Sequence, residues 1–192
     1  KTDDGYEWLD GGSLPRPMAY AAAVSTPRGV VVMGGNDSSD TFDDVILLSW
    51  DVATKSLTQS SLPSLPKPCA FGSATLIGDV IYLAGGLSGS ELSTAMKNFW
   101  SLDLSLSDDL EAFQWRELPT WPGPERALNI TAAQHDGFTD GVYVISGRRQ
   151  DGESVDFLKD VYEYKPSTQE WRARADTPQC VMAGTGIGWG QS

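Results

Sequence analysis

The chain repeats one pattern of hydrophobic and polar positions three times. A short run of β-branched and other apolar residues ends at glycine and passes into a polar loop, at residues 30–36, 80–86 and, with a single glycine, 142–147. Such an unbroken apolar run predicts a strand that is buried on both faces. The glycine after it permits a positive φ or a close backbone approach that a Cβ would block. A repeat of about 50 to 60 residues is therefore the feature that the fold must explain.

Each repeat contains four predicted strands, of which the first two form a hairpin. The predicted strands of the first repeat are residues 18–24, 30–33, 44–50 and 56–59. Those of the second are residues 69–77, 80–84, 98–104 and 113–118, and those of the third are 127–133, 141–146, 160–164 and 170–172. A tryptophan marks the fourth strand at Trp115 and Trp171, Trp8 fits the same position near the start of the chain, and Leu57 replaces it once.

A unit of about 50 residues with four antiparallel strands is typical of a β-propeller blade, and this period fits the kelch repeat. One four-stranded sheet cannot bury both of its faces alone, so blades stack radially with aromatic residues between them. Recurrent Gly and Pro argue against helices, and the repeat argues against an immunoglobulin-like sandwich. The predicted class is all-β: a kelch β-propeller of four-stranded antiparallel blades, with about three blades and part of a fourth in this chain.

We expect a single partial propeller domain over residues 1–192. Its parts are a closing outer strand of the last blade at 1–13, blades at 14–61, 62–118 and 119–175, and the start of the next blade at 176–192. Propellers typically have 4–8 blades, so we expect roughly half of a larger propeller. An unpaired strand at the chain end would leave an open edge, which favours a homodimer.

Composition narrows the classes of partner. The 14 Lys and Arg against 26 Asp and Glu give a net charge of −12, which disfavours nucleic acid and anionic membrane surfaces. No run approaches the ~20 apolar residues of a membrane span. Cys69 and Cys180 are expected as separate thiols, and the single histidine, His135, falls on a predicted hairpin turn. No ligand cluster with metal spacing is visible, so we expect no metal and no cofactor.

The position of a residue in a blade selects candidates for binding. Loops after the glycines and the starts of the innermost strands face the mouth of the central channel in a kelch propeller. The candidates for substrate binding are Tyr20, Asn36, Arg126, Arg148 and Arg149. A guanidinium can hold a carboxylate through two parallel hydrogen bonds, so the arginines suit an acidic ligand. The same arginines could instead pair with Asp and Glu of the loops, and both roles stay open.

Several segments resemble one known family. Residues 16–20 with 30–35 resemble the final blade of the kelch-type N-acetylneuraminate (sialic acid) mutarotases, also called epimerases. Residues 115–118 with 121–126 are similar to an early blade of that family, and residues 141–147 with 159–166 continue the resemblance. The last blade of the family comes first here, which resembles the cyclically permuted branch.

The resemblance implies an isomerase of carbohydrate metabolism that interconverts the α and β anomers of sialic acid, a small acidic sugar. A base takes the proton of the anomeric hydroxyl while an acid protonates the ring oxygen, and the reverse steps reclose the ring. It implies that Arg126 lines the mouth, and that the acid/base glutamate lies beyond Ser192, so that no catalytic residue is assigned. It also implies a periplasmic protein whose signal peptide is absent from this chain. The alternative is a non-catalytic kelch propeller that binds a protein or sugar ligand at its mouth.

Overall fold

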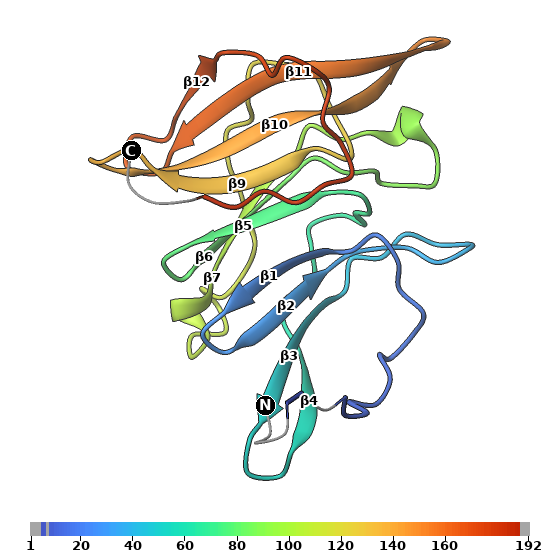
Figure 1. The fold of residues 1–192 in the computed structure, drawn as a ribbon, viewed down its shortest axis with the longest axis vertical. Coiled ribbons are helices and arrows are strands. Elements are labelled where there is room, and N and C mark those ends of the chain that lie inside the picture. Colours follow the sequence, from blue (N-terminus) through green and yellow to red (C-terminus); the bar gives the residue numbers. More distant parts are fainter. Residues whose placement is uncertain (1–4, 7, 189–192) are drawn as a thin grey trace.

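The computed structural model describes residues 5–6 and 8–188, and within them the chain forms three four-stranded antiparallel sheets (Figure 1). The first sheet has the order β1 (Ala22–Thr26), β2 (Gly29–Met33), β3 (Val45–Asp51) and β4 (Ser56–Ser61). The second consists of β5 (Ser73–Ile77), β6 (Val80–Ala84), β7 (Phe99–Asp103) and β8 (Arg116–Glu117), and the third of β9 (Ile130–His135), β10 (Asp140–Asp151), β11 (Ser154–Lys165) and β12 (Glu170–Arg174). Two short 3-10 turns, η1 (Leu92–Thr94) and η2 (Leu104–Leu106), flank β7. The predicted all-β class with four-stranded antiparallel blades is confirmed.

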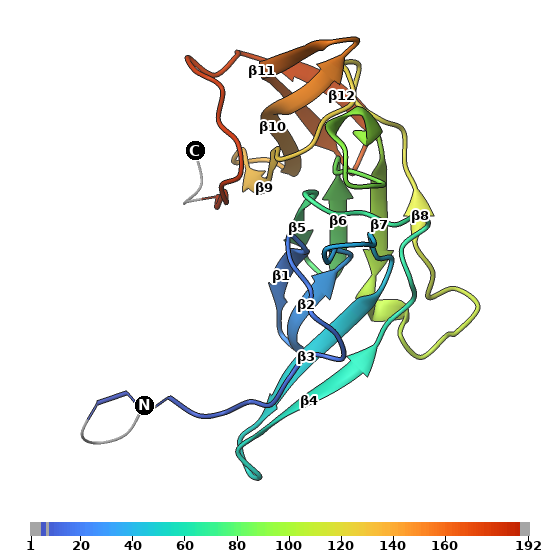
Figure 2. The same cartoon turned by 90° about the vertical axis from the view of Figure 1, so that its right-hand side faces the viewer.

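The sheets are stacked so that their first strands, β1, β5 and β9, lie next to one another, while the fourth strands lie on the outside (Figures 1 and 2). Neighbouring residues of β6 face opposite sheets, as expected for a strand that is buried twice. Ile81 and Leu83 pack in one core with the first sheet, and Tyr82 and Ala84 pack in a second core with the third sheet. The apolar run of each repeat therefore fills the two interfaces between blades.

The repeated tryptophans connect the outer strands to the linkers between blades. The indole N–H of Trp115 donates to the carbonyl of Pro63 at 2.8 Å, and that of Trp171 donates to the carbonyl of Pro119 at 2.6 Å. The Trp171 ring also contacts Phe99 of the preceding sheet with its centroid at 4.9 Å. A buried indole needs a hydrogen-bond partner, and the linker carbonyl provides one in each case.

Backbone hydrogen bonds join each blade to the next at the starts of the inner strands. Tyr20, Phe71, Leu128 and Ala183 all have a left-handed backbone, with φ between 54° and 59°. The N–H groups of Phe71, Leu128 and Ala183 each donate to the carbonyl of the preceding member of the series, at 2.8–3.0 Å. Because an L-residue disfavours this conformation, the bonds between blades must hold it in place. We call this series the inner ring.

The contact between blades also requires a left-handed backbone at the residue that follows the apolar run of each second strand. In the first two sheets this residue is a glycine. Gly34 and Gly85 have φ values of 64° and 67°, and a Cβ on Gly34 would overlap the carbonyl oxygen of Cys69 in the next blade. In the third blade Ser146 adopts φ 56° in this position. Its hydroxyl donates to the carbonyl of Leu158 at 2.6 Å and accepts from the N–H of Val181 at 2.8 Å. The side chain of Ser146 therefore stabilises this position, whereas a side chain at Gly34 would collide with the next blade. This explains the weaker form of the third repeat.

Two sequence predictions differ from the structure around the third blade. Arg148 and Arg149 were expected in a loop, but β10 continues past Gly147 to Asp151 after a bulge and pairs with β11. The turn between β10 and β11 contains Gly152 at φ 58°, and this turn lets the two strands extend beyond the rest of the sheet. A first strand was expected at residues 180–189, yet residues 180–188 form none, and Trp189 lies outside the described residues.

The two ends of the chain carry the remaining predicted parts of blades. Residues 8–13 form no strand and Trp8 is 99% exposed, while residues 1–4 and 7 lie outside the described residues. An outer strand forms only against its own blade, so the closing strand stays a prediction. At the other end, the N–H of Ala183 donates to Leu128 and that of Gly147 donates to Val181. These bonds place residues 181–183 where a fourth blade would begin.

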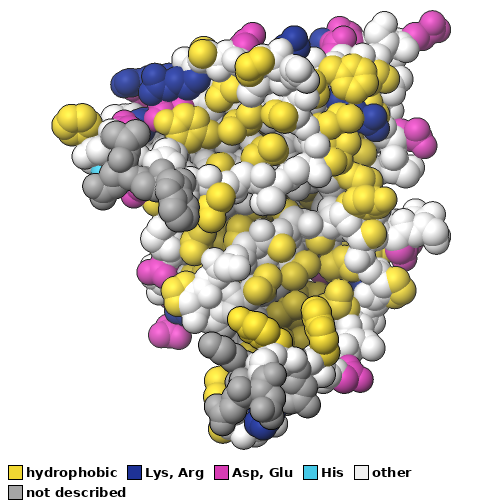
Figure 3. Space-filling model, in the orientation of Figure 1, with side chains coloured by type: hydrophobic (Ala, Val, Ile, Leu, Met, Phe, Trp, Pro, Cys, Tyr) yellow, Lys and Arg dark blue, Asp and Glu magenta, His cyan; other side chains and the backbone are white. Residues whose placement is uncertain are grey.

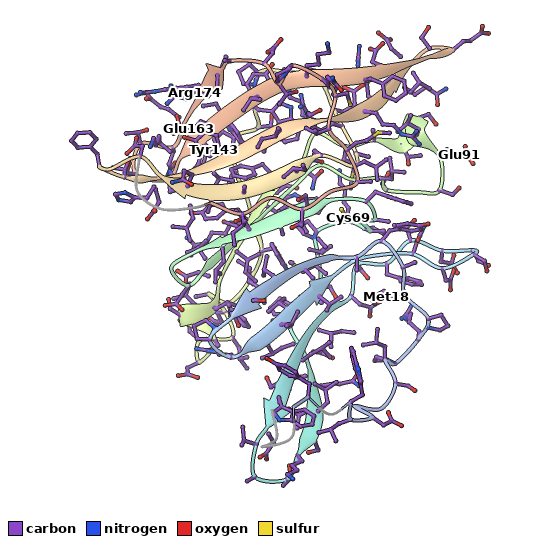
Figure 4. The ribbon with its side chains drawn as sticks, viewed as in Figure 1. Met18, Cys69, Glu91, Tyr143, Glu163 and Arg174 are labelled. Atoms are coloured by element: carbon purple, nitrogen blue, oxygen red, sulfur yellow. The ribbon has the colours of Figure 1, made fainter. Side chains whose placement is uncertain are left out.

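The third sheet buries a carboxylate on the face that points away from the second sheet. Glu163 has no exposed surface, and it accepts hydrogen bonds from Tyr143, Lys165 and Arg174 (Figure 4). Basic and acidic side chains lie side by side at the upper left of the molecule (Figure 3), where Figure 4 labels Glu163 and Arg174. Burial alone raises the pKa of Glu163, but the three donors together outweigh it and lower the pKa below its usual value. The carboxylate is therefore ionised and fully used by its partners.

We predict that Gly34→Ala destabilises the protein by about 4 kcal/mol, because it combines a left-handed backbone with a collision against the next blade. Gly78→Ala is the matched control, since Gly78 has φ 58° but open space around its Cβ position. It should cost about 1 kcal/mol. Urea unfolding of both variants checks the difference. Equal losses would show that the collision with Cys69 contributes nothing.

We predict that Glu163→Gln lowers the free energy of unfolding by about 3 kcal/mol at neutral pH, because Lys165 and Arg174 lose their shared anion. The lowered pKa makes this contribution complete above the unfolded value of 4.5 and lost as the pH falls through the lower folded value. Urea unfolding at pH 7 and at pH 3 to 4 should show the difference from the natural protein shrinking with acid. Glu153→Gln, an exposed acid in the β10–β11 turn, is the control. A difference that does not depend on pH would contradict this account.

Candidate functional site

The turns after the second strands and the starts of the first strands lie at one end of the three sheets, which we call the mouth end. Equivalent β-bridges define it in each blade: Ala19 pairs with Asn36, Ala70 with Leu87, and Ala127 with Arg148. Asn36, Leu87 and Arg148 therefore occupy the same position in successive blades. The backbone of Asn36 both donates to and accepts from Ala19 at 2.8 Å, which fixes its place beside the inner strand.

The structure brings two predicted residues, Tyr20 and Asn36, together around one cavity at the mouth end. The cavity measures about 620 Å³ and is lined by residues 17–20 and 36–38. Tyr20 is 61% exposed, and its ring stacks on Phe71 with centroids 4.1 Å apart and an angle of 21° between the rings. Because the inner ring fixes the backbone of both residues, the two aromatic rings form a rigid, flat surface with a hydroxyl at its edge.

Asp37 lies in the same cavity, directly after Asn36 in the post-glycine loop. Its Oδ1 accepts from the backbone N–H groups of Ser39 at 2.7 Å and Asp40 at 2.8 Å. These backbone hydrogen bonds lower the pKa of Asp37, the one to Asp40 most strongly. The carboxylate is therefore ionised near neutral pH and can accept hydrogen bonds from the hydroxyls of a ligand. The sequence signal for it is an acid directly after the post-glycine position.

A second carboxylate at the mouth end, Glu91, was missed by the sequence reasoning. It is exposed on the loop after the Gly85–Gly86 pair, directly before η1 (Figure 4). The length of this loop places Glu91 several residues beyond the glycines, where position in the repeat alone does not single it out.

Arg126 does not line the mouth in this structure. It has no exposed surface, and its two terminal nitrogens each lie 2.8 Å from a carboxylate oxygen of Asp160. One of them also donates to the carbonyl of Ser146 at 3.0 Å. Arg126 stands two residues before the inner-ring residue Leu128, as the buried Cys69 stands before Phe71, so this position points into the blade. The expected exposure of Arg126 is corrected accordingly.

Arg149 is surrounded by three carboxylates. Its nitrogens lie 3.1 Å from Glu125, 2.7 Å from Asp151 and 3.0 Å from Asp156. The hydrogen bond with Glu125 is the main cause that raises the pKa of the guanidinium. Of the two roles left open by the sequence, the structure favours pairing with neighbouring acids for Arg149.

Arg148 is the predicted arginine that forms no ion pair with the residues of the described structure. It is half-buried in β10, where its backbone exchanges hydrogen bonds of 3.0 Å with Ala127. Its Nε is buried and has no hydrogen-bond partner among residues 5–6 and 8–188. Because Arg126 and Arg149 are paired with acids and Arg148 has no such pair in the described part of the chain, Arg148 is the arginine best able to take an anionic ligand.

The described residues also bear on metal binding, membrane insertion and thiol chemistry. Within the described part of the chain, no three His, Cys, Asp or Glu side chains come together to hold a metal ion. No helix among these residues has the length and apolar character needed to cross a bilayer. Cys69 and Cys180 form no disulfide, and burial raises the pKa of the Cys69 thiol to about 12, so this thiol is unreactive.

Comparison with a known structure supports the propeller architecture. A solved structure described as the structure of YjhT superposes on 92% of this chain and 58% of its own length, with a TM-score of 0.67. The sequence identity is 16%, so this likeness bears on the fold alone.

Sequence comparisons extend the likeness to named proteins. The N-acetylneuraminate epimerase of Haemophilus influenzae (strain PittEE) is 32% identical over 141 residues, which cover 71% of this chain and 33% of that protein. The Kelch-like protein terF of Aspergillus terreus is 25% identical over 185 residues, which cover 92% of this chain and 37% of that protein. The chain thus spans about a third of the length of the curated relatives it matches.

A sequence model of one family agrees with these relatives and covers the second and third sheets. The model of the N-acetylneuraminate epimerase family matches residues 62–189, which is well over half of the 192 residues. The family resemblance predicted from the sequence is confirmed, and the chain belongs to the N-acetylneuraminate epimerase family.

Proposed function

We propose that the protein containing this chain is an isomerase that interconverts the α and β anomers of N-acetylneuraminate. The family match over residues 62–189 carries the proposal. The substrate is a small acidic sugar, and the proposed location is the periplasm. The activity needs a pocket that binds a carboxylate and several hydroxyls and that lets the pyranose ring open and close.

The mouth end offers binding groups of the right kinds. Arg148, which has no ion pair among the described residues, suits the sugar carboxylate through a charge-assisted hydrogen bond. The Tyr20–Phe71 stack offers a flat apolar surface for one face of the sugar, and the amide of Asn36 can both donate and accept. These groups belong to different blades, so a ligand at the mouth would bridge them.

Proton transfer needs an acid and a base, and the lowered pKa of Asp37 makes it a weak base as well as a poor acid. Its lowered pKa keeps it ionised at neutral pH, so it can accept a hydrogen bond but is a poor proton donor to the ring oxygen. A general acid works best with a pKa near the working pH. We therefore assign binding residues here and leave the catalytic acid/base unassigned.

A second candidate function is a kelch propeller that binds a ligand at its mouth without chemistry. The observation that favours it is the Kelch-like protein terF, which aligns with 92% of this chain although it bears no epimerase name. The same propeller can serve either use, since the fold alone does not determine the function.

The intact protein should accelerate the exchange between the two anomers of N-acetylneuraminate at least tenfold over the buffer rate. NMR exchange spectroscopy on the distinct signals of the anomers measures this rate, with heat-denatured protein as the control. Binding of the sugar without faster exchange would support the second candidate function. Neither binding nor faster exchange would refute the sugar as the ligand.

Tyr20→Ala should raise the KM for the sugar about five- to tenfold, because the stacked surface contributes about 1 kcal/mol of contact. The kcat should change less, since the residue touches the sugar in all states. Alanine is compatible with this backbone, because Ala183 holds the corresponding position at φ 54°. Phe138→Ala removes an aromatic ring that is 91% exposed at the other end of the third sheet, and should leave both constants unchanged. The prediction fails if the two variants behave alike.

A further inference from the structure

The three sheets differ at one equivalent position, the residue before the one on the third strand that pairs with the end of the apolar run of the second strand. The registers pair Met33 with Val45, Ala84 with Phe99 and Ile145 with Val161. The preceding residues are therefore equivalent, and they are Asp44, Asn98 and Asp160. The second sheet thus carries an amide where its neighbours carry a carboxylate.

Both carboxylates at this position pair with an arginine. Asp44 lies 3.3 Å from a guanidinium nitrogen of Arg16, and Asp160 lies 2.8 Å from one of Arg126. In the second sheet the sequence position of Arg16 is taken by Lys67, two residues before the buried Cys69. Lys67 therefore keeps a cation at the position of Arg16. Arg126, the partner of Asp160, instead occupies the position of Cys69. The second sheet has the cation of the first sheet without its anion.

Asn98 is buried and unsatisfied. It is 8% exposed, and neither its Nδ2 nor its Oδ1 has a hydrogen-bond partner among residues 5–6 and 8–188. Its main-chain carbonyl accepts from Gly85 at 3.2 Å, so the backbone is fixed while the amide is not used. Native proteins pair nearly all buried polar groups, and an exception marks a place where a water or a ligand group belongs.

Asn98 lines a cavity of about 280 Å³ on the outer part of the second blade, which we call the amide pocket. The exposed side chains of Lys67 and Lys97 line it too, and neither forms an ion pair with a residue of the described structure, although Lys97 acts electrostatically on Glu125. Glu117 is the one acid in the lining, opposite Trp100 in the β7–β8 ladder. Two cations against one anion leave the pocket positive within an acidic protein.

The amide pocket lies further out on the blade than the inner ring, although Asn98 precedes β7 at the same end of the sheet as the Gly85–Gly86 turn. It is formed by β7, by β8 at the outside of the blade and by the linkers on either side (Figure 2). An equivalent cavity in the first blade contains Arg16 and Asp44. The two pockets differ in three charged positions: Asn98 replaces Asp44, Glu117 replaces Ser61 on the fourth strand, and Lys97 joins the lining.

We propose that the amide pocket binds a small carboxylate, which takes the place that Asp44 and Asp160 fill in the neighbouring sheets. The carboxylate oxygens accept hydrogen bonds from the ammonium groups of Lys67 and Lys97 and from the amide of Asn98. The amide oxygen of Asn98 accepts from an N–H or O–H group beside the carboxylate. The matching chemistry is an N-acylamino acid or hydroxy acid, either free or as an acidic residue of a peptide.

Titration of the ¹⁵N-labelled intact protein with N-acetylglycine tests the proposal, with the side-chain amide of Asn98 as the reporter. The amide signal should shift in a saturable way at millimolar concentration, and neutral N-acetylglycinamide should cause no such shift. A blocked Gly-Asp-Gly peptide distinguishes the two sources of the carboxylate: tighter binding of this peptide assigns the site to an acidic side chain, and weaker binding assigns it to a free acid.

Three substitutions complete the test. Asn98→Asp restores the carboxylate of the other blades, so it should abolish binding of N-acetylglycine and raise the melting temperature of the unliganded protein. Lys97→Gln should weaken binding about fivefold. Lys55→Gln makes the same charge change on an exposed turn of the first sheet and should not alter binding.

Binding that survives Asn98→Asp, or equal binding of the neutral amide, would overturn the proposal. So would the absence of a saturable shift in the natural protein. Should the Asn98→Asp protein fail to fold, the comparison of Lys97→Gln with Lys55→Gln decides, because equal affinities of these two would also overturn it.

Discussion

The arrangement of the blades depends on backbone hydrogen bonds made in an unfavourable conformation. At the inner ring, four residues have φ near +55°, and three of them, Phe71, Leu128 and Ala183, donate to the preceding blade. The second glycine of each turn donates forward, from Gly35 to Cys69 and from Gly86 to Arg126. Side-chain packing between blades is extensive but tolerant of substitution, whereas these bonds require a fixed distance between backbones. They set the spacing on which both cores and the mouth end depend.

This constraint decides which side chains can reach a ligand. The left-handed backbone of Tyr20 turns its ring out of the sheet, and the next ring residue, Phe71, supports it from the neighbouring blade. Two positions earlier, the same geometry turns a side chain inward, which buries Cys69 and Arg126. A binding residue at the mouth therefore belongs to the ring itself, to the bridge positions of Asn36 and Arg148, or to the loop directly after them, as Asp37 does. Each blade thus presents few positions that can vary with the ligand.

Much of the fold could be predicted from the sequence, because burial on both faces leaves an unbroken apolar run and a tryptophan repeats in the fourth strand. The site could be predicted only in part. Position in the repeat correctly gave Asn36 and Arg148 equivalent places, but it could not tell that Arg126 points inward, since its partner Asp160 lies 34 residues away in the chain. It also could not tell that β10 extends through Arg149, because a polar segment with a Gly152 turn fits a loop as well as an extended hairpin.

The net negative charge of the chain restricts which residues can bind an anionic ligand. With a net charge of −12, the chain repels an anion at long range, so an anionic ligand must meet a cation that no internal acid already holds. Arg126 is paired with Asp160, and Arg149 with three acids, so neither can offer a free guanidinium without breaking a salt bridge. Arg148 at the mouth end, and the lysines beside Asn98, lack such partners in the described structure. Affinity for an acidic ligand therefore depends on which carboxylates the sequence leaves out as much as on which cations it includes.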